Sequence, residues 1–494
     1  MIRLLFFRFE IPPTLDGLIY FRYAIDLIIF GKFPPHYDIP NNGWPIFLSV
    51  FFMPLAENDF MDYARVQQLL TISISVLTII VVYLLCTRFT TKQYSLFGTA
   101  LFAFEPHIIQ NSLLGISEPA YILLTTLSLF FSKSSDKKII CSSFAVAALA
   151  TVIRYEGLMI FFILSIVFFA KYKKEPKSVL FYLFGVLIFV VVLFPVSYLR
   201  MQEYGYDGIL SNFVGSVSIY KTEAIDYKDT YTGSFSYIIT GFLNFFKFLG
   251  IVMLPILLFF VPIGVLMIFK KKEQHRLTIM ISLIFLSLPA LYAYSRGIQE
   301  TRYLLVLLPL FSVLGTFALK KWLDTSERKN FILFSLIIII LTSSVIFVNL
   351  NLDIKHEKEA FIVSQYIVDH STGVNQYYPE SRYIHSAIIQ KKWDVIKPYL
   401  QNKANSKLGV NEIIQEFPVI PSTDFTSLSD YIKNSRERGL SHIVVDDKID
   451  RSQLLRDVFY HPENYEYLKK EFNSTELGFD YNVRIYRIDY SKMN

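Results

Sequence analysis

The fold is decided by residues 137–174, which read KKIICSSFAVAALATVIRYEGLMIFFILSIVFFAKYKK. Two apolar blocks, 138–153 and 157–170, lie between lysines and are joined by the polar residues Arg154, Tyr155 and Glu156. A helix of roughly 17–25 apolar residues is needed to cross the hydrocarbon core of a bilayer. Both blocks are short for a span, so the polar residues between them read as a tight turn. The stretch therefore predicts two membrane helices with a charged turn between them.

Blocks of the same kind fill the first 350 residues of the chain. The others are 64–87, 94–111, 116–132, 178–199, 246–269, 276–294, 302–319 and 331–349. Over the whole chain 53% of the residues are hydrophobic and only 18% are charged, whereas a soluble domain usually carries more charge. The sequence predicts a polytopic α-helical membrane domain over residues 1–349, with about ten transmembrane helices.

Lysine and arginine mark alternate loops of this domain. The loops rich in positive charge are 88–92, 133–138, 171–177, 270–276 and 320–329. The loops between them, 105–117, 154–156, 200–244 and 295–302, are poor in it. Positively charged loops stay in the cytoplasm. We therefore expect a multi-pass protein of the cell membrane, whose other loops and the chain after residue 350 are extracytoplasmic.

Two segments outside the apolar blocks have a character of their own. Residues 16–30 predict an amphipathic helix suited to the membrane interface, with Arg22 and Asp26 on its polar face. After residue 350 the apolar blocks end, and helices at 356–370 and 427–438 alternate with strands at 443–445 and 483–488. Residues 350–494 thus predict a small soluble α/β domain. Cys86 and Cys141, the two cysteines, both fall in apolar blocks, so neither a disulfide framework nor a cysteine metal site is expected in this domain.

Acids and arginines gather at the helix ends of the extracytoplasmic side. They are Asp16, Asp26, Glu105, Glu118, Arg154, Glu156, Arg296, Glu300 and Arg302. Charges at membrane depth are costly and usually pair with one another or line a wet cavity. Each residue alone could sit in the headgroup layer, but the set as a whole predicts a polar site on this face.

Four short motifs that carry these charges resemble one family. They are Thr14-Leu15-Asp16-Gly17, Phe104-Glu105-Pro106-His107 with Ser117-Glu118-Pro119, Arg154-Tyr155-Glu156-Gly157, and Glu300-Thr301-Arg302-Tyr303. Their order and common side resemble the GT-C superfamily of glycosyltransferases that use lipid-phosphate sugars. Within it the chain is most similar to the protein O-mannosyltransferase and aminoarabinose transferase branch, and it looks like an archaeal member. The resemblance covers roughly residues 10–320.

The resemblance implies a polyprenyl-phosphate or dolichyl-phosphate sugar donor, a mannose-like hexose, and reaction on the outer face. It assigns the base to Asp16, a second catalytic acid to Glu118, and the lipid phosphate to Arg154 and Arg302. Family members have a full membrane helix before the aspartate loop, and this sequence has nine residues there, so a misassigned or truncated start is expected. The Trp-Trp-Asp-Tyr-Gly motif of oligosaccharyltransferases is absent from the sequence, which argues against transfer to asparagine.

The chemistry of the residues agrees with this assignment. An ionised aspartate can accept the proton of an attacking hydroxyl, and arginine forks match phosphate oxygens. Glu105, His107, Arg296 and Glu300 are expected to support the site from its surroundings. Structural alternatives exist for three residues, since Asp16 could cap a helix, Glu118 could stabilise a helix N-terminus, and Arg154 could pair only with Glu156. Lone histidines do not make a metal site. Branches of the family that the motifs resemble differ in their use of a divalent metal, so that alternative stays open, and no metal or other cofactor is predicted.

We therefore expect a membrane hexosyltransferase that works by a single, inverting displacement onto a hydroxyl of a protein, glycan or lipid. A transporter of a polar or anionic solute is the alternative, although transporters usually place charges near the midplane and carry inverted repeats. A scaffold that merely displays residues 350–494 would not need so many helices. Neither reading involves nucleic acid.

Overall fold

The computed structural model describes residues 2–493, apart from 36, 38, 173–174, 176–177, 216–233, 271–275, 325, 378, 402–408, 415–416 and 423–424. Parts of the loops 171–177, 200–244 and 270–276 thus lie outside the described residues. Contacts divide the chain into two compact units. The first comprises Met1–Phe6, Tyr37–Phe47 and Gln68–Asn351, and the second comprises Phe7–His36, Leu48–Gln67 and Leu352–Asn494.

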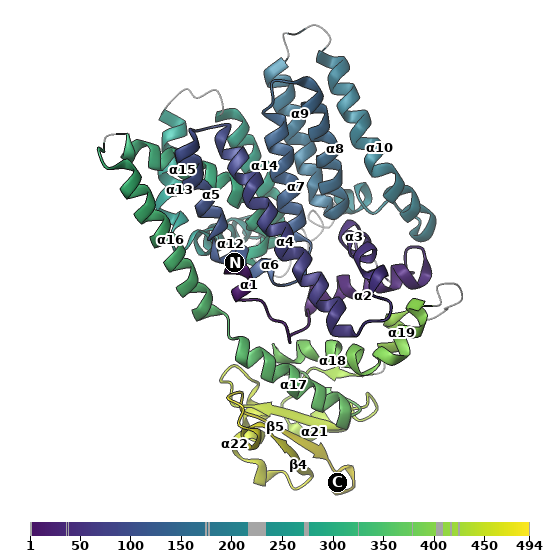
Figure 1. Cartoon of the computed structure of the whole chain (residues 1–494). Helices are drawn as coiled ribbons and strands as arrows, with labels where there is room; N and C mark the ends of the chain where they lie inside the picture. The colour runs from purple at the N-terminus through teal and green to yellow at the C-terminus, as the bar shows by residue number, and fades with distance from the viewer. Residues whose placement is uncertain are drawn as a thin grey trace. The chain divides into compact units, whose positions relative to one another are not determined.

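The first unit consists of helices that follow the apolar blocks. They are α1 (Ile2–Leu5), α4 (Phe60–Thr87, which starts in the second unit), α5 (Lys92–Ala103), α6 (Pro106–Ser112), α7 (Glu118–Ser132), α8 (Lys137–Ile153), η2 (Tyr155–Gly157), α9 (Leu158–Tyr172), α10 (Ser178–Tyr204), α12 (Ser234–Met253), α13 (Leu257–Lys270), α14 (Arg276–Ser295), η3 (Thr301–Leu307), α15 (Leu308–Leu323) and α16 (Lys329–Asn351). Helices α7, α8, α9 and α10 lie side by side (Figure 1).

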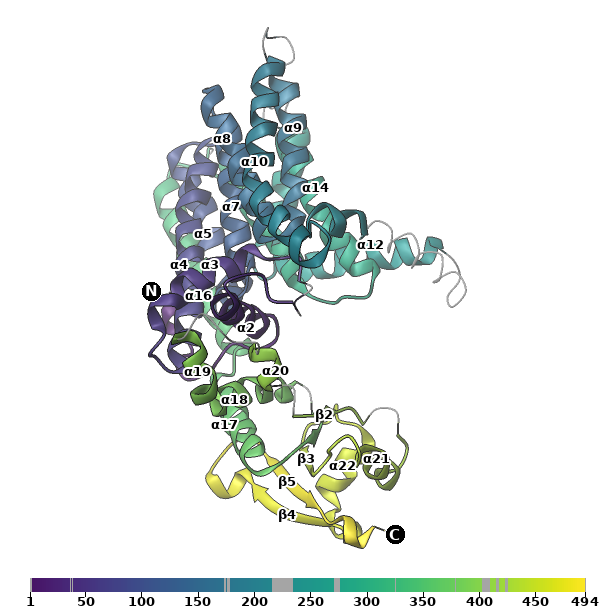
Figure 2. The same cartoon turned by 90° about the vertical axis from the view of Figure 1, so that its right-hand side faces the viewer.

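Six helical segments of the described chain are long and apolar enough to cross a membrane. They are Phe60–Thr87, Tyr155–Tyr172, Ser178–Tyr204, Arg276–Ser295, Thr301–Leu323 and the segment that begins with α16. Helices α12 and α13 form a pair bent by 114°, which would make a seventh span, and Figure 2 shows α12 running across the direction of α9 and α10. The chain is thus a multi-pass membrane protein, as expected, whereas the number of ten spans stays a prediction because α7 and α8 are shorter.

Small residues let the helices approach closely around α15, whose apolar side chains are almost all buried. A Cβ on Gly98 of α5 would lie 2.8 Å from the carbonyl oxygen of Ser312, and one on Gly264 of α13 would lie 2.2 Å from that of Leu314. Membrane helices commonly pack in this way, because lipid tails give no hydrophobic reason for helices to associate. Helix α15 is therefore the centre of the unit.

The second unit combines N-terminal helices with the C-terminal domain. Its elements before residue 68 are α2 (Leu15–Phe30), the end of α3 (Gly43–Phe52), η1 (Met53–Leu55) and the start of α4. Those after residue 351 are α17 (Ile354–His370), β1 (Val374–Asn375), η4 (Glu380–Tyr383), α18 (Ile384–Lys391), α19 (Trp393–Gln401), α20 (Val410–Ile414), β2 (Val419–Ile420), α21 (Leu428–Ser435), β3 (His442–Asp446), α22 (Gln453–Tyr460), η5 (Pro462–Asn464), β4 (Leu468–Asn473), η6 (Ser474–Leu477), β5 (Val483–Ile488) and η7 (Tyr490–Lys492).

The C-terminal part is the expected α/β domain. Its sheet has the strand order β2-β1-β3-β5-β4, in which β1 is parallel to β2 and β3 while β5 is antiparallel to β3 and β4. The four elements predicted after residue 350 correspond to α17, α21, β3 and β5.

Five aromatic rings join the two parts of the second unit. They belong to Phe21, Phe52, Phe60, Tyr63 and Trp393. The Trp393 ring lies 5.2 Å from that of Tyr63, and its indole Nε1 donates to the carbonyl oxygen of Asn58 at 3.0 Å. Sequence analysis assigned residues 7–36 and 48–67 to the membrane domain, but their contacts place them with residues 352–494 because this aromatic cluster draws on both.

A buried ion network holds the carboxyl ends of the strands. Arg451 Nε donates to Asp446 Oδ1 at 2.8 Å and its Nη2 to Glu380 Oε2 at 2.6 Å, while His356 Nε2 lies 3.0 Å from Glu380 Oε1. Burial alone would raise the pKa of Glu380, but the hydrogen bond to His356 and the charge of Arg451 outweigh it, so the pKa is below its ordinary value. The ionised form of Glu380 therefore stabilises this domain.

We expect Arg451→Met to destabilise the domain by about 3–5 kcal/mol, because two buried carboxylates lose their cation. Hydrogen exchange of the β3 and β5 amides would measure the change, and Arg456→Met on the exposed face of α22 is the matched control. Because the pKa of Glu380 is depressed by folding, its contribution is present above the ordinary pKa of a glutamate and lost as the pH falls through the depressed value. The difference between wild type and variant should shrink in acid, and equal exchange at neutral pH would contradict the assignment.

Candidate functional site

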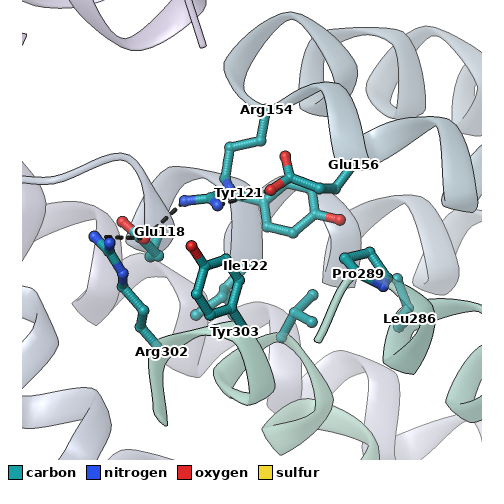
Figure 3. Close-up of a pocket in the computed structure, with 10 residues that line it drawn as sticks. Glu118, Tyr121, Ile122, Arg154, Glu156, Leu286, Pro289, Arg302 and Tyr303 are labelled. Carbon is teal, nitrogen blue, oxygen red and sulfur yellow. Dashed lines mark hydrogen bonds and ion pairs between the residues drawn. The ribbon is translucent and has the colours of Figure 1, made fainter. Parts of the chain in front are cut away.

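Three charged side chains predicted from sequence meet where α7 begins and α8 ends. Arg154 Nη1 donates to Glu118 Oε1 at 2.7 Å, and Arg154 Nη2 donates to Glu156 Oε1 at 2.8 Å (Figure 3). Their exposed fractions are 9% for Arg154, 4% for Glu118 and 8% for Glu156. One guanidinium thus bridges two buried carboxylates.

Local sequence explains how these residues reach one another. Glu118 is the first residue of α7 and is followed by Pro119, which suits the first turn of a helix. A carboxylate is also favoured at this position by the helix dipole. Arg154 ends α8 in extended conformation, and the single turn η2 then reverses the chain into α9. The turn therefore brings the side chain of Glu156 back to Arg154.

Gly157 is essential to this turn because of a close approach of backbone to backbone. A Cβ at this position would lie 2.5 Å from the backbone nitrogen of Thr151 and 2.7 Å from the carbonyl carbon of Ala150. No flexible side chain could move away to make room. The glycine of the Arg-Tyr-Glu-Gly motif therefore fixes the distance between α8 and the start of α9.

Arg302 approaches the same carboxylate from the opposite side (Figure 3). Its Nη1 lies 3.8 Å from Glu118 Oε1, and its Nε pairs with Glu300. The side chain of Arg302 is more exposed than that of Arg154, at 23% against 10%. Glu118 therefore lies between two arginines, of which Arg302 is the one nearer to solvent.

Aromatic rings flank the charges. The Arg154 guanidinium lies 5.9 Å from the ring centre of Tyr121, and that of Arg302 lies 5.6 Å from the ring centre of Tyr303. Together with the charged residues they line a small pocket of about 20 Å³, which Ile122, Leu286, Pro289 and Val306 complete. The pocket thus has one charged side and one apolar side.

A larger pocket of about 590 Å³ adjoins the first and shares Arg154, Glu156, Pro289 and Tyr303 with it. Its other walls are mostly apolar. They come from Met159, Phe213, Ile238, Phe242, Leu288, Leu291, Ala293 and Ile298, with polar groups on Asn41, Tyr155, Tyr292, Ser295 and Arg296. This combination suits a ligand with an anionic head and a hydrocarbon chain.

A buried arginine that sequence analysis placed in a loop supports the larger pocket. Arg200 lies inside α10 and donates from Nη1 to the carbonyl oxygen of Ile39 and to Asn42 Oδ1, both at 2.8 Å. These two residues flank Asn41, which lines the pocket. Arg200 therefore anchors the segment that carries Asn41.

The four supporting residues predicted from sequence divide into two pairs. Glu300 pairs with Arg302, and Arg296 lines the larger pocket beside Tyr292. Glu105 instead caps α6, because its carboxylate accepts from the backbone nitrogen of Ile108 at 3.1 Å and lies 2.9 Å from His107 Nδ1. Neither Glu105 nor His107 is among the described residues that line the two pockets.

Asp16 belongs to the second unit, as the second residue of α2. Thr14 occupies the N-cap position, so the capping alternative for Asp16 is wrong. Its role as the base stays a prediction. In the described part of the chain, no three His, Cys, Asp or Glu side chains are grouped so that they could hold a metal ion.

Sequence analysis did not assign roles to Glu156, Tyr121 or Tyr303. Each lies within three positions of a residue that it did select, and Glu156 follows Arg154 by two positions. Tyr121 follows Glu118 by three positions on α7, and Tyr303 directly follows Arg302. The spacing of three places Tyr121 on the same helix face as Glu118.

We expect Gly157→Ala to lower the free energy of unfolding by about 1–3 kcal/mol, because overpacking forces backbone apart. Gly250→Ala is the matched control, since nothing lies within 4 Å of its new Cβ and alanine favours a helix. Thermal unfolding of the purified protein in detergent would compare the two. Equal melting temperatures for both variants would contradict the close approach at Gly157.

No protein-family model matches the sequence, and no curated protein sequence matches it significantly. Solved structures do match. The oligosaccharyltransferase of Archaeoglobus fulgidus, tethered to an acceptor peptide with an NVT sequon, gives a TM-score of 0.53 at 12% identity over 88% of this chain and 65% of that chain. The same enzyme in complex with an inhibitory peptide and a dolichol-phosphate gives a TM-score of 0.55 at 10% identity. This match covers 98% of this chain and 71% of that chain.

A further match, ArnT from Cupriavidus metallidurans, has a TM-score of 0.42 at 10% identity over 97% of this chain and 94% of that chain. The chain spans about two thirds of the length of the oligosaccharyltransferase. At these identities the likeness concerns the fold alone, and it extends over most of the chain. The chain therefore shares the fold of the Archaeoglobus fulgidus oligosaccharyltransferase, which agrees with the fold that the resemblance of its motifs implies.

Proposed function

We propose that this protein is a membrane glycosyltransferase that takes its sugar from a polyprenyl-phosphate donor. The observation that carries the proposal is a pair of arginines: Arg154 and Arg302 both line the smaller pocket, and Arg154 also lines the large apolar pocket beside it. The oligosaccharyltransferase that shares the fold binds a dolichol-phosphate, which supports the same class of donor here.

The two pockets suggest how such a donor would bind. Its phosphate would lie against Arg302, whose guanidinium is the more exposed, and its first isoprene units would pack against Phe213, Phe242 and Leu288. Arginine is well suited to this role because its planar fork matches two phosphate oxygens and its charge is permanent. Tyr303 lies in both pockets, beside the point where phosphate and lipid would join.

Glu118 acts through the arginines in this proposal. Its carboxylate accepts from Arg154 and lies 3.8 Å from Arg302, so it would orient both guanidinium groups before the donor arrives. Preorganised cations of this kind stabilise charge that develops in the transition state. The catalytic role that the resemblance gave to Glu118 is thereby reinterpreted as a positioning role.

The reaction would be one displacement. The oxygen of the acceptor hydroxyl attacks the anomeric carbon of the sugar while the bond from that carbon to the phosphate oxygen breaks. The hydroxyl proton passes to the carboxylate of Asp16, and polyprenyl phosphate leaves with the bonding electrons. Attack from the face opposite to the leaving group inverts the anomeric centre, and we propose a mannose-like hexose as the sugar.

We further propose that transfer takes place on the extracytoplasmic face of the cell membrane, which the placement of lysines in alternate loops supports. The acceptor would carry a free hydroxyl on a protein, a glycan or a lipid. A protein is favoured, because the oligosaccharyltransferase with the same fold takes a peptide acceptor.

Asp16→Asn should lower kcat for transfer by at least about 100-fold, since loss of a general base typically costs 10²–10⁴-fold. The assay follows radiolabelled mannose from dolichyl-phosphate mannose to endogenous acceptors in membranes that contain the protein. Affinity for the donor should persist, because Asp16 has no part in phosphate binding in this proposal. Asp59→Asn, an exposed aspartate of the same unit, is the control. Absence of transfer by wild type from several hexose donors would favour the transporter reading.

Arg302→Ala should weaken binding of dolichyl phosphate about 10- to 100-fold, the cost of losing a hydrogen bond to a charged group. Arg302→Lys should recover part of the affinity, because lysine keeps the positive charge but lacks the planar guanidinium that binds two phosphate oxygens. Equilibrium binding of dolichyl phosphate to the purified protein measures both variants, with Arg328→Ala, an exposed arginine before α16, as the control. Equal affinities for all variants would place the phosphate elsewhere.

A further inference from the structure

The helix that carries Asp16 is part of the same compact unit as the C-terminal domain. Helix α2 contacts α19 and α20, which lie almost 400 residues further along the sequence. Phe21 of α2 belongs to the aromatic cluster around Trp393, and its side chain is fully buried. The surroundings of Asp16 are therefore built by the C-terminal domain as well as by the N-terminal helices.

The backbone is held on both sides of Asp16. The hydroxyl of Ser386 in α18 donates to the carbonyl oxygen of Pro13 at 2.9 Å, and the amide Nε2 of Gln67 in α4 donates to that of Gly17 at 2.7 Å. Both donors are completely buried. Since buried hydrogen bonds are expensive to break, the two contacts confine the segment between Pro13 and Gly17.

Between these two contacts the chain adopts a conformation that needs outside support. Leu15 has a φ of +48°, in the left-handed region that non-glycine residues rarely occupy. Such a conformation is unfavourable and persists only where the surrounding structure determines it. The residue directly before Asp16 is thus held in place by contacts made on either side of it.

The far half of α2 is fixed to the C-terminal domain as well. Asp26 is buried, and its Oδ1 accepts from the backbone nitrogen of Val410 at 2.7 Å. A Cβ on Gly409 would lie 2.9 Å from Asp26 Oδ1 and equally close to Phe30, so the two segments are in direct contact. The helix therefore cannot rotate or slide without breaking contacts at both ends.

We propose that Ser386 and Gln67 are positioning residues for Asp16, and that the C-terminal domain sets the orientation of the catalytic base. The inference rests on the proposed function, because it takes Asp16 to be the base. A general base works only within hydrogen-bond reach of the proton that it takes. Misplacement by about 1 Å can cost on the order of 100-fold in rate, so the two hydrogen bonds matter for kcat rather than for donor binding.

The test uses the full chain with Ser386→Ala and, separately, Gln67→Leu. Each should lower kcat for transfer about tenfold while the KM for dolichyl-phosphate mannose changes less than about twofold. Hydrogen exchange of the amides of residues 15–20 should become faster. Ser364→Ala is the matched control, because this serine of α17 is equally buried but its hydroxyl bonds to Ala360 and Tyr377. Ser364→Ala should change neither kcat nor the hydrogen exchange of residues 15–20.

The outcomes separate the inference from the function on which it rests. An unchanged kcat in both variants, or a kcat that falls together with donor affinity, would overturn the positioning role while transfer by wild type upholds the proposed function. Absence of transfer by wild type would overturn the proposed function and with it the positioning role. Unchanged exchange at residues 15–20 in both variants would overturn the anchoring itself.

Discussion

A buried guanidinium must be neutralised, and the arrangement of the first unit follows from how Arg154 meets this requirement. Removing either partner of a buried ion pair typically costs several kcal/mol, because the remaining charge is left without compensation. Glu118 and Glu156 both accept from Arg154, so the start of α7, the end of α8 and the turn into α9 must lie together. Arg302 then joins the cluster through Glu118, which brings the start of η3 to the same point.

In the proposed function, the same neutralisation would prepare the site for an anion. Arg154 has two carboxylates, whereas Arg302 is partly exposed and lies at the rim of the cluster. An incoming phosphate would therefore meet one arginine that can turn toward it and one that is held fixed behind it. The adjoining large pocket is mostly apolar, which supports the proposal that the phosphate carries a hydrocarbon chain.

Much of this could be predicted from the sequence. Apolar blocks predict the helices because length and composition decide whether a helix is stable in lipid, and the motif Arg154 to Gly157 indicates the charged turn. The alternative that Arg154 pairs only with Glu156 is wrong, because Arg154 also donates to Glu118, while its role in phosphate binding stays a prediction. The role of Phe21 and Trp393 could not be foreseen. In a chain with 46 phenylalanines and 32 tyrosines, the periodicity of aromatic residues does not show which distant rings will pack together.

Helix α2 shows why the sequence misassigned one segment. Its apolar positions follow a helical spacing, so the charges Arg22 and Asp26 were expected to face water beside a membrane. Asp26 is instead buried against the start of α20, where a backbone amide donor compensates the lost hydration. Spacing along a helix shows which side chains share a face, but it cannot show whether a distant segment covers that face. A carboxylate with a dedicated backbone donor fixes one register between two segments, since a slide along the helix would leave both groups buried without partners. The hydrogen bond at Asp26 therefore determines the axial position of α2. The position of Asp16 within the second unit follows from it.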